Sequence, residues 1–211
     1  MPHKLIASAR YSRTARLVAI DPSPEMLSAA ITRQPEVPHN VHFVLASAES
    51  FEPHGKFSLV VAAESLQWME WSSVLPKVAR CLSHDGRLAI VLPRGWVGLP
   101  WEAELRALLA RHSTNQDYRP YDLVEELAQR GLFEEQGRTR AVQPYFEQDL
   151  ATYIEAFHAR NGFSRQRMGE AAAQAFDGAV RELVLRHRPD GKVSGELAAS
   201  VVWGSVGGLP H

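Results

Sequence analysis

Acidic residues that follow runs of β-branched residues are the side chains of this sequence best placed to bind a ligand. The first is Asp21, which follows Arg16-Leu-Val-Ala-Ile20. A carboxylate just beyond a strand, with a helix beginning shortly after it, can accept hydrogen bonds from both hydroxyls of a ribose. The alternative is a surface aspartate in a proline-rich turn, because Pro22 and Pro24 follow it.

The second segment that could bind a ligand is Ala46 to Phe51, which follows the β-type run Val41 to Leu45. Small residues at that point allow the backbone to approach an adenine ring closely. Ser47 or Glu49 could then accept a hydrogen bond from the exocyclic amine of the ring. A loop with a solvated glutamate is the alternative, and the residues alone leave both open.

The third segment, Ala62 to Trp71, combines two tryptophans, a glutamine and two acids after another β-type run. Large polar and aromatic side chains at the carboxyl edge of a sheet can form the wall of a ligand pocket. The alternative is that Trp68 and Trp71 pack in the core or against a helix.

The elements around these segments alternate between strands and helices, which predicts an α/β fold with a mostly parallel sheet. The expected strands and helices of this part are 16–20, 24–33, 41–45, 57–62, 71–82 and 87–92. The run 57–62 is almost continuously apolar, which is typical of a strand covered on both faces. Asp85-Gly86 is expected to form the turn before the last of these strands.

The second half of the chain is predicted to be more helical. Helices are expected over 100–112, 122–130, 149–158 and 170–187, and strands over 138–146 and 197–206. Asp122 and Glu125 form a capping box at the start of one helix, and Gly131 ends it. We expect a single domain over 1–211, with a core of about 14–95 and a variable helical and strand region of about 96–211.

The composition is that of an ordinary globular protein, with 45% hydrophobic and 22% charged residues and a net charge of −1. The near-neutral charge argues against a general nucleic-acid binder. No run of residues is long and apolar enough to span a membrane, and no secretory signal is expected. The single cysteine, Cys81, fits a reducing compartment, so we expect a cytoplasmic protein. The nine histidines form no metal-binding motif, and there is no nucleophile elbow.

The order of four segments resembles the class I S-adenosylmethionine-dependent methyltransferases, in particular the type 11 methyltransferase domain. Val18-Ala-Ile-Asp-Pro-Ser-Pro-Glu-Met-Leu27 is similar to the second-strand signature of that family. Phe43-Val-Leu-Ala-Ser-Ala-Glu-Ser-Phe51 is similar to its adenine-contacting segment. The runs 57–68 and 78–91 resemble its fourth strand and the helix, turn and fifth strand that follow.

The resemblance implies a Rossmann-like fold with helices on both faces of the sheet and an antiparallel last strand. It implies S-adenosylmethionine as the cofactor and a small molecule as the substrate. No side chain is assigned a catalytic role and no metal is expected. The residues expected to bind the cofactor are Asp21 at the ribose, Pro22 and Met26 near the adenosine, Ser47, Ala48 and Glu49 at the adenine, and Glu64 facing the cofactor or substrate. The residues expected to line the substrate site are Gln67, Trp68, Arg94, Trp96 and Tyr153.

The sequence departs from the family pattern in two places. Serine stands at positions 47 and 58, where the family often has aspartate. In addition, no glycine precedes Gly55, and only twenty residues precede Asp21, whereas the family's first strand ends in a glycine-rich turn that holds the cofactor. That strand is the central one of the family sheet, so we expect it to be missing, through a truncated product or gene model. The alternatives are a sheet closed over the gap, a displaced start, or substitution by the N-terminal residues.

Methyl transfer from S-adenosylmethionine to a small molecule is therefore the predicted function, with activity impaired by the missing segment. A non-catalytic methyltransferase-like protein that acts by binding or subunit association is the alternative. An NAD-dependent enzyme also uses an acid after its second strand. That class requires the glycine fingerprint more strictly, so the missing glycines weigh against it.

Overall fold

The computed structural model describes residues 16–32, 39–93, 95–115 and 121–207. The chain divides into two compact units. The strand unit is made of Pro2–Leu92, Asp122–Thr139 and Val201–His211, and the helical unit is made of Pro93–Tyr121 and Arg140–Ser200. Each unit is described by itself below, and the single-domain organisation expected from the sequence stays a prediction.

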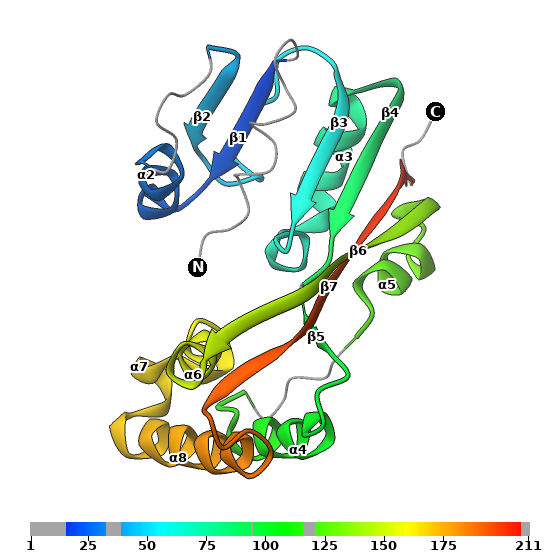
Figure 1. The fold of residues 1–211 in the computed structure, drawn as a ribbon. Coiled ribbons are helices and arrows are strands. Elements are labelled where there is room, and N and C mark those ends of the chain that lie inside the picture. Colours follow the sequence, from blue (N-terminus) through cyan, green and yellow to red (C-terminus); the bar gives the residue numbers. More distant parts are fainter. Residues whose placement is uncertain (1–15, 33–38, 94, 116–120, 208–211) are drawn as a thin grey trace. The chain divides into compact units, whose positions relative to one another are not determined.

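The strand unit begins with a parallel pair of strands. Strand β1 (Leu17–Asp21) pairs with β2 (Val41–Leu45), and the register sets Asp21 beside Leu45 (Figure 1). Helix α2 (Pro24–Thr32) connects them and buries Leu27 and Ala30. These three elements lie where the sequence predicts them.

A second parallel pair forms the centre of the strand unit. Strand β3 (Phe57–Ala63) pairs with β4 (Leu82–Val91). The 3-10 turn η1 (Leu66–Trp68) and helix α3 (Trp71–Cys81) connect the two strands (Figure 1). Part of β7 pairs antiparallel with β4, so the fold is mixed α/β, mostly parallel with an antiparallel last strand, as the sequence predicts.

Strand β4 is longer than expected, because Asp85 and Gly86 lie inside it. The pairing of β3 with β4 shifts register between Phe57 and Leu59. A Cβ atom at position 86 would lie 2.9 Å from the carbonyl oxygen of Phe57. The glycine is therefore needed for close backbone approach at an irregular point of the strand, and its prediction as a turn before the strand was wrong.

The two strand pairs are not joined into one sheet. Among the described residues, β1 pairs only with β2, and the outer edge of β3 pairs with no strand. Leu59 and Val61 of β3 are 53% and 54% exposed. The prediction that β3 is covered on both faces was therefore wrong. An apolar run shows only the composition of a strand. Whether both faces of that strand are buried depends on the elements that pack against it. Any substitution for a central strand by residues 1–15 lies outside the described residues.

The core of the strand unit lies on the other face of β3 and β4. Its fully buried members come from β4, α3 and η1, and from α5 (Leu123–Gln129) and β7. The most deeply buried of them are Leu66, Leu75, Leu88, Ile90, Leu127 and Val202. Helix α5 begins as predicted, since the carboxylate of Asp122 accepts hydrogen bonds from the backbone N–H groups of Val124 and Glu125. It ends before Gly131, whose φ of 67° is the left-handed conformation that favours glycine.

Two long strands contribute residues to both units. Strand β6 (Phe133–Asp149) pairs with β7 (Lys192–Val206), and both are longer than the sequence predicts. Most of β6 is exposed and rich in charged residues, which hides its strand character from an analysis of hydrophobic periodicity.

The helical unit is built around a large aromatic core. Its elements are β5 (Gly95–Val97), α4 (Glu102–His112), α6 (Leu150–His158), η2 (Asn161–Phe163), α7 (Arg165–Met168) and α8 (Glu170–His187). Trp101, Tyr153, Phe157 and Phe176 are buried together in this core. The buried imidazole of His158 hydrogen-bonds the carbonyl oxygen of Phe163 and the carboxylate of Asp177, and so joins α6 to α8. No helix among the described residues is long and apolar enough to cross a bilayer.

The one-sided burial of β3 makes a prediction about two leucines. Leu88→Ala should lower the free energy of unfolding by about 2–5 kcal/mol, because Leu88 is 1% exposed and its truncation leaves a cavity. Leu59→Ala should lower it by less than about 1 kcal/mol, because that side chain already contacts solvent. Urea unfolding of both variants measures the difference. Equal losses would contradict the exposed face of β3.

Candidate functional site

The carboxyl ends of β1 and β2 lie side by side, so the first two segments that could bind a ligand are neighbours. The backbone N–H of Ala46 donates to the carbonyl oxygen of Asp21 over 3.2 Å, directly after the paired residues Asp21 and Leu45. Asp21 and the start of the loop at residues 46–52, called the adenine-type loop below, therefore meet at one edge of the sheet. This is the edge at which open α/β sheets bind ligands.

The carboxylate of Asp21 is oriented by the turn that follows it. Its Oδ1 accepts a hydrogen bond of 2.8 Å from the backbone N–H of Ser23. The hydroxyl oxygen of Ser23 in turn accepts from the N–H of Met26 at the start of α2. No hydrogen bond from the described residues reaches Oδ2 of Asp21. Pro22 beside it is exposed and Met26 is half-buried. One oxygen of Asp21 is thus held by the turn, and the other accepts no hydrogen bond from the described residues.

The adenine-type loop is a turn closed by Ser47. The N–H of Phe51 donates to the carbonyl oxygen of Ser47 over 3.0 Å, and the N–H of Ser50 donates to the Ser47 hydroxyl over 3.2 Å. Ala48 is half-buried within this turn. The side chain of Ser47 therefore shapes the loop, a role that the sequence does not predict.

Glu49 is tied to the beginning of α3. Its Oε1 accepts a hydrogen bond of 3.0 Å from the backbone N–H of Glu70, and this contact lowers the pKa of the Glu49 carboxyl. Lys77 of the same helix donates to the carbonyl oxygen of Glu49 over 2.6 Å. Glu70 belongs to the segment Ala62 to Trp71, but its contact with Glu49 was not expected, and Lys77 was not expected at the site. The sequence of α3 gives no sign of the loop that these residues contact.

Glu64 lies at the carboxyl end of β3. Its N–H donates to the carbonyl oxygen of Val91 over 2.9 Å, which continues the ladder between β3 and β4. Its φ of 47° is left-handed, and among the described residues no other non-glycine residue has a positive φ. The side-chain amide of Gln67 donates to the carbonyl oxygen of Glu64 over 3.1 Å. The backbone is therefore held in a sparsely populated conformation at the end of the strand.

The two tryptophans of this segment differ in their surroundings. Trp68 is 71% exposed. Trp71 is half-buried, and its indole N–H donates to the carbonyl oxygen of Leu66 over 2.8 Å, while the guanidinium of Arg130 lies over its ring. Trp71 thus packs as the structural alternative suggests, and Trp68 offers an exposed aromatic surface next to Glu64 and Gln67 in the chain.

The remaining residues expected to line the substrate site belong to the helical unit. Trp96 is half-buried and contacts the rings of Phe146 and Tyr153. Tyr153 is 2% exposed, and its hydroxyl accepts a hydrogen bond of 3.4 Å from the indole N–H of Trp101. Tyr153 is thus a core residue here, which an isolated aromatic in a helical pattern does not reveal. Arg94 lies outside the described residues.

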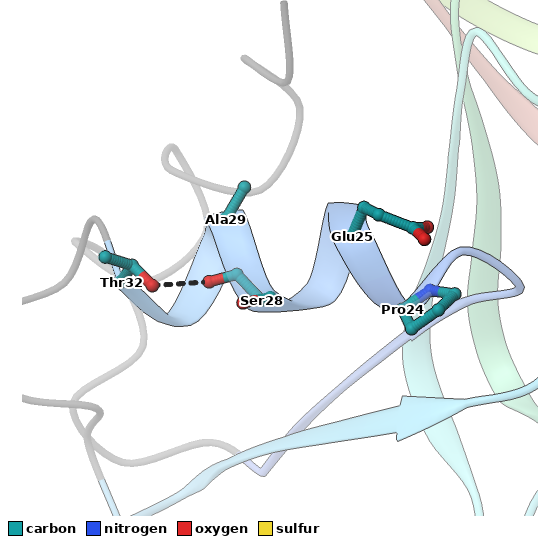
Figure 2. A pocket seen from close by; sticks show the side chains of 5 residues that line it. All are labelled: Pro24, Glu25, Ser28, Ala29 and Thr32. Atoms are coloured by element: carbon teal, nitrogen blue, oxygen red, sulfur yellow. Dashed lines mark hydrogen bonds between the residues drawn. The ribbon is translucent and has the colours of Figure 1, made fainter.

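A hollow of about 610 Å³ lies elsewhere in the strand unit. Figure 2 shows the five side chains along one side of α2 that line it. They are Pro24, Glu25, Ser28, Ala29 and Thr32. All come from a single helix, and Thr32 uses its hydroxyl to hydrogen-bond the Ser28 carbonyl (Figure 2). The hollow is therefore the open flank of α2 and brings no convergent polar groups together, unlike the edge formed by Asp21 and the loop.

A metal site requires several ligating side chains close together. Within the part of the chain that the structure describes, no three His, Cys, Asp or Glu side chains are close enough together to hold a metal ion.

The left-handed conformation of Glu64 makes a prediction about stability. Glu64→Gly should unfold with a free energy about 0.5–1 kcal/mol higher than Glu64→Ala, because glycine adopts positive φ without steric cost and alanine does not. Both variants lose the carboxylate, so the comparison isolates the backbone. Chemical unfolding measures it, and an alanine variant as stable as the glycine variant would contradict the strain.

The chain is similar to known proteins in sequence and in fold. The family model described as a methyltransferase domain matches residues 3–90. Trans-aconitate 2-methyltransferases of Escherichia fergusonii and Escherichia coli O139:H28 are 32% and 31% identical to the chain over 84 residues. These matches cover 39% of this chain and 32% of each relative, so the chain spans about a third of the length of these curated relatives.

Two solved structures share the fold. A protein from Anaeromyxobacter dehalogenans, described as a candidate type II methyltransferase, has a TM-score of 0.58 at 18% identity and covers 93% of this chain and 82% of its own. The YcgJ protein of Bacillus subtilis has a TM-score of 0.50 at 15% identity, with coverage of 92% and 82%. Residues 3–90 therefore match a methyltransferase domain, and the chain shares the fold of the two solved structures.

Proposed function

We propose that this chain binds S-adenosylmethionine at the carboxyl ends of β1, β2 and β3 and transfers its methyl group to a small molecule in the cytoplasm. The observation that carries the proposal is the adjacency of Asp21 and the 46–49 turn, which the parallel register of β1 and β2 fixes. The free, buried Cys81 supports a reducing compartment.

Asp21 is suited to the ribose of the cofactor. Its Oδ1 is held by the Ser23 N–H, which prevents the side chain from rotating, and its Oδ2 faces no donor among the described residues. A carboxylate with a free oxygen accepts from ribose hydroxyls by strong, charge-assisted hydrogen bonds. Pro22 and Met26 stand on either side of the turn, where their apolar surfaces would contact the adenosine.

The 46–49 turn is suited to the adenine ring. Ala48 presents a methyl group, so a flat ring can approach the backbone closely. Ser47 and Glu49 hold the turn in shape, and the Glu49 carboxylate would accept a hydrogen bond from the exocyclic amine of adenine.

The reaction requires alignment of the acceptor more than proton transfer. S-adenosylmethionine, when bound, supplies a methyl group on a positively charged sulfur. Glu64 places a carboxylate at the end of β3, where it would favour that positive charge. Gln67 holds the Glu64 backbone, and exposed Trp68 supplies an apolar surface that excludes water from the acceptor. Positioning of the reacting atoms then provides much of the rate acceleration.

The acceptor that we propose is a small carboxylic acid. The curated relatives carry the name trans-aconitate 2-methyltransferase, and residues 3–90, which the methyltransferase family model matches, include the segments from Asp21 to Trp68. The assignment of Arg94 and Trp96 to the substrate site stays a prediction from the resemblance.

Asp21→Asn should weaken binding of S-adenosylhomocysteine by about 10- to 100-fold, since hydrogen bonds to a charged group contribute about 1.5–3 kcal/mol. The amide keeps the size of the side chain and the Asn oxygen can still accept from the Ser23 N–H. Isothermal titration calorimetry of the full chain measures the affinity. Asp85→Asn is the matched control, because Asp85 is exposed and lies away from the site, and its affinity should be unchanged.

Two results would redirect the proposal. A folded chain that binds no S-adenosylhomocysteine would favour the non-catalytic methyltransferase-like protein. Displacement of bound S-adenosylhomocysteine by NAD at similar concentration would favour a dinucleotide enzyme instead.

A further inference from the structure

Lys77, a residue that was not predicted for the site, makes three contacts with the adenine-type loop. We propose that Lys77 is a positioning residue that holds residues 46–52 in the conformation that binds the cofactor. This inference rests on the proposed function, because it assigns a role to a contact of the same site.

The ammonium group of Lys77 meets three oxygen atoms of the loop. It lies 2.6 Å from the carbonyl oxygen of Glu49, 3.4 Å from that of Phe51 and 2.6 Å from Oε1 of Glu52. An ammonium group has three N–H donors, so these oxygens occupy its full capacity. The contact with Lys77 also lowers the pKa of the Glu52 carboxyl. The loop is thus fastened at its backbone and at a side chain.

The position of Lys77 sets this cluster apart from the ion pairs at the surface. Its side chain is only 17% exposed, although its partner Glu52 is 68% exposed. The Arg106–Glu102 pair is 78% and 52% exposed, which is typical of pairs that contribute little. Restricted access to water strengthens the contacts of Lys77 with the two carbonyl oxygens.

A second attachment of the loop starts from the same helix. The N–H of Glu70, the residue that caps α3, donates to the carboxylate of Glu49. Glu70 caps the amino end of α3 and Lys77 lies within the helix, so both attachments come from the same element. Glu49 is therefore held from both directions, by its carboxylate and by its carbonyl oxygen.

The consequence for binding follows from the loop's place in the site. Ala48 and Glu49 are the residues proposed to border the adenine; Glu49 carries two of the attachments, and Ala48 directly precedes it. Without Lys77, the carbonyl oxygens of Glu49 and Phe51 lose their charged donor and the loop samples other conformations. A loop that is in the binding conformation one tenth of the time binds its ligand about tenfold more weakly.

The test is binding of S-adenosylhomocysteine to Lys77→Met, which keeps the length of the aliphatic stem. We expect affinity to fall about tenfold, with the far-ultraviolet circular dichroism of the unaltered chain retained. Lys77→Arg should recover most of the affinity, because a guanidinium can donate to a carbonyl oxygen and to a carboxylate at the same time. Hydrogen exchange of the peptide that covers residues 46–52 should be faster in Lys77→Met than in the unaltered chain.

Lys56 provides the matched control. Its ammonium group also donates to two backbone carbonyl oxygens, those of Arg80 and Leu82, but before the amino end of β3. Lys56→Met should leave both the affinity and the exchange of 46–52 unchanged.

The outcomes separate the two proposals. A folded Lys77→Met variant that binds as tightly as the unaltered chain would overturn the role of Lys77 alone. Unaltered exchange of residues 46–52 in that variant would do the same, and this readout needs no ligand. Failure of the unaltered chain itself to bind would overturn the proposed function and, with it, this inference.

Discussion

The parallel pairing of β1 with β2 is the interaction on which the candidate site depends. Asp21 and Ala46 are more than twenty residues apart in the chain, and only the backbone hydrogen bonds of this pair bring them together. Side chains alternate between the two faces of a strand, so a slip of one residue would turn Asp21 to the opposite face. The site is therefore a product of register first and of side-chain chemistry second. The contacts that Glu70 and Lys77 make with the loop then hold Glu49 in place beside this strand pair.

The sequence was sufficient to predict elements whose signals are local. Strand β2 has the predicted bounds, and α5 begins at the predicted cap, since the Asp122 carboxylate reaches donors only two and three residues away. The order of the segments from Asp21 to Trp68 was sufficient to predict the match of residues 3–90 to a methyltransferase domain. Turns and strands of this kind depend on neighbouring residues in the sequence, so they can be predicted without knowledge of the fold.

Features that depend on distant residues could not be predicted in this way. The exposure of Leu59, the burial of Tyr153 and the contacts of Lys77 are each decided by residues far away in the chain. The location of Gly86 within a strand depends on the Phe57 carbonyl oxygen, 2.9 Å from where its Cβ would lie. In the candidate site, the types of side chain were predicted from the sequence. The structure was needed to show that the Ser47 hydroxyl shapes the turn and that the Ser23 N–H holds one oxygen of Asp21.

One edge of β3 pairs with no strand among the described residues, and this has a consequence for how the protein behaves in concentrated solution. Natural sheets discourage pairing between molecules by placing charges or proline on exposed edge strands. Strand β6 follows this rule, with several charged residues and Pro144. Strand β3 is a stretch of seven residues without charge or proline, and charges occur only at its borders, in Lys56 and Glu64. Self-association of this protein is therefore expected to begin at β3, and to increase with salt as the two flanking charges are screened.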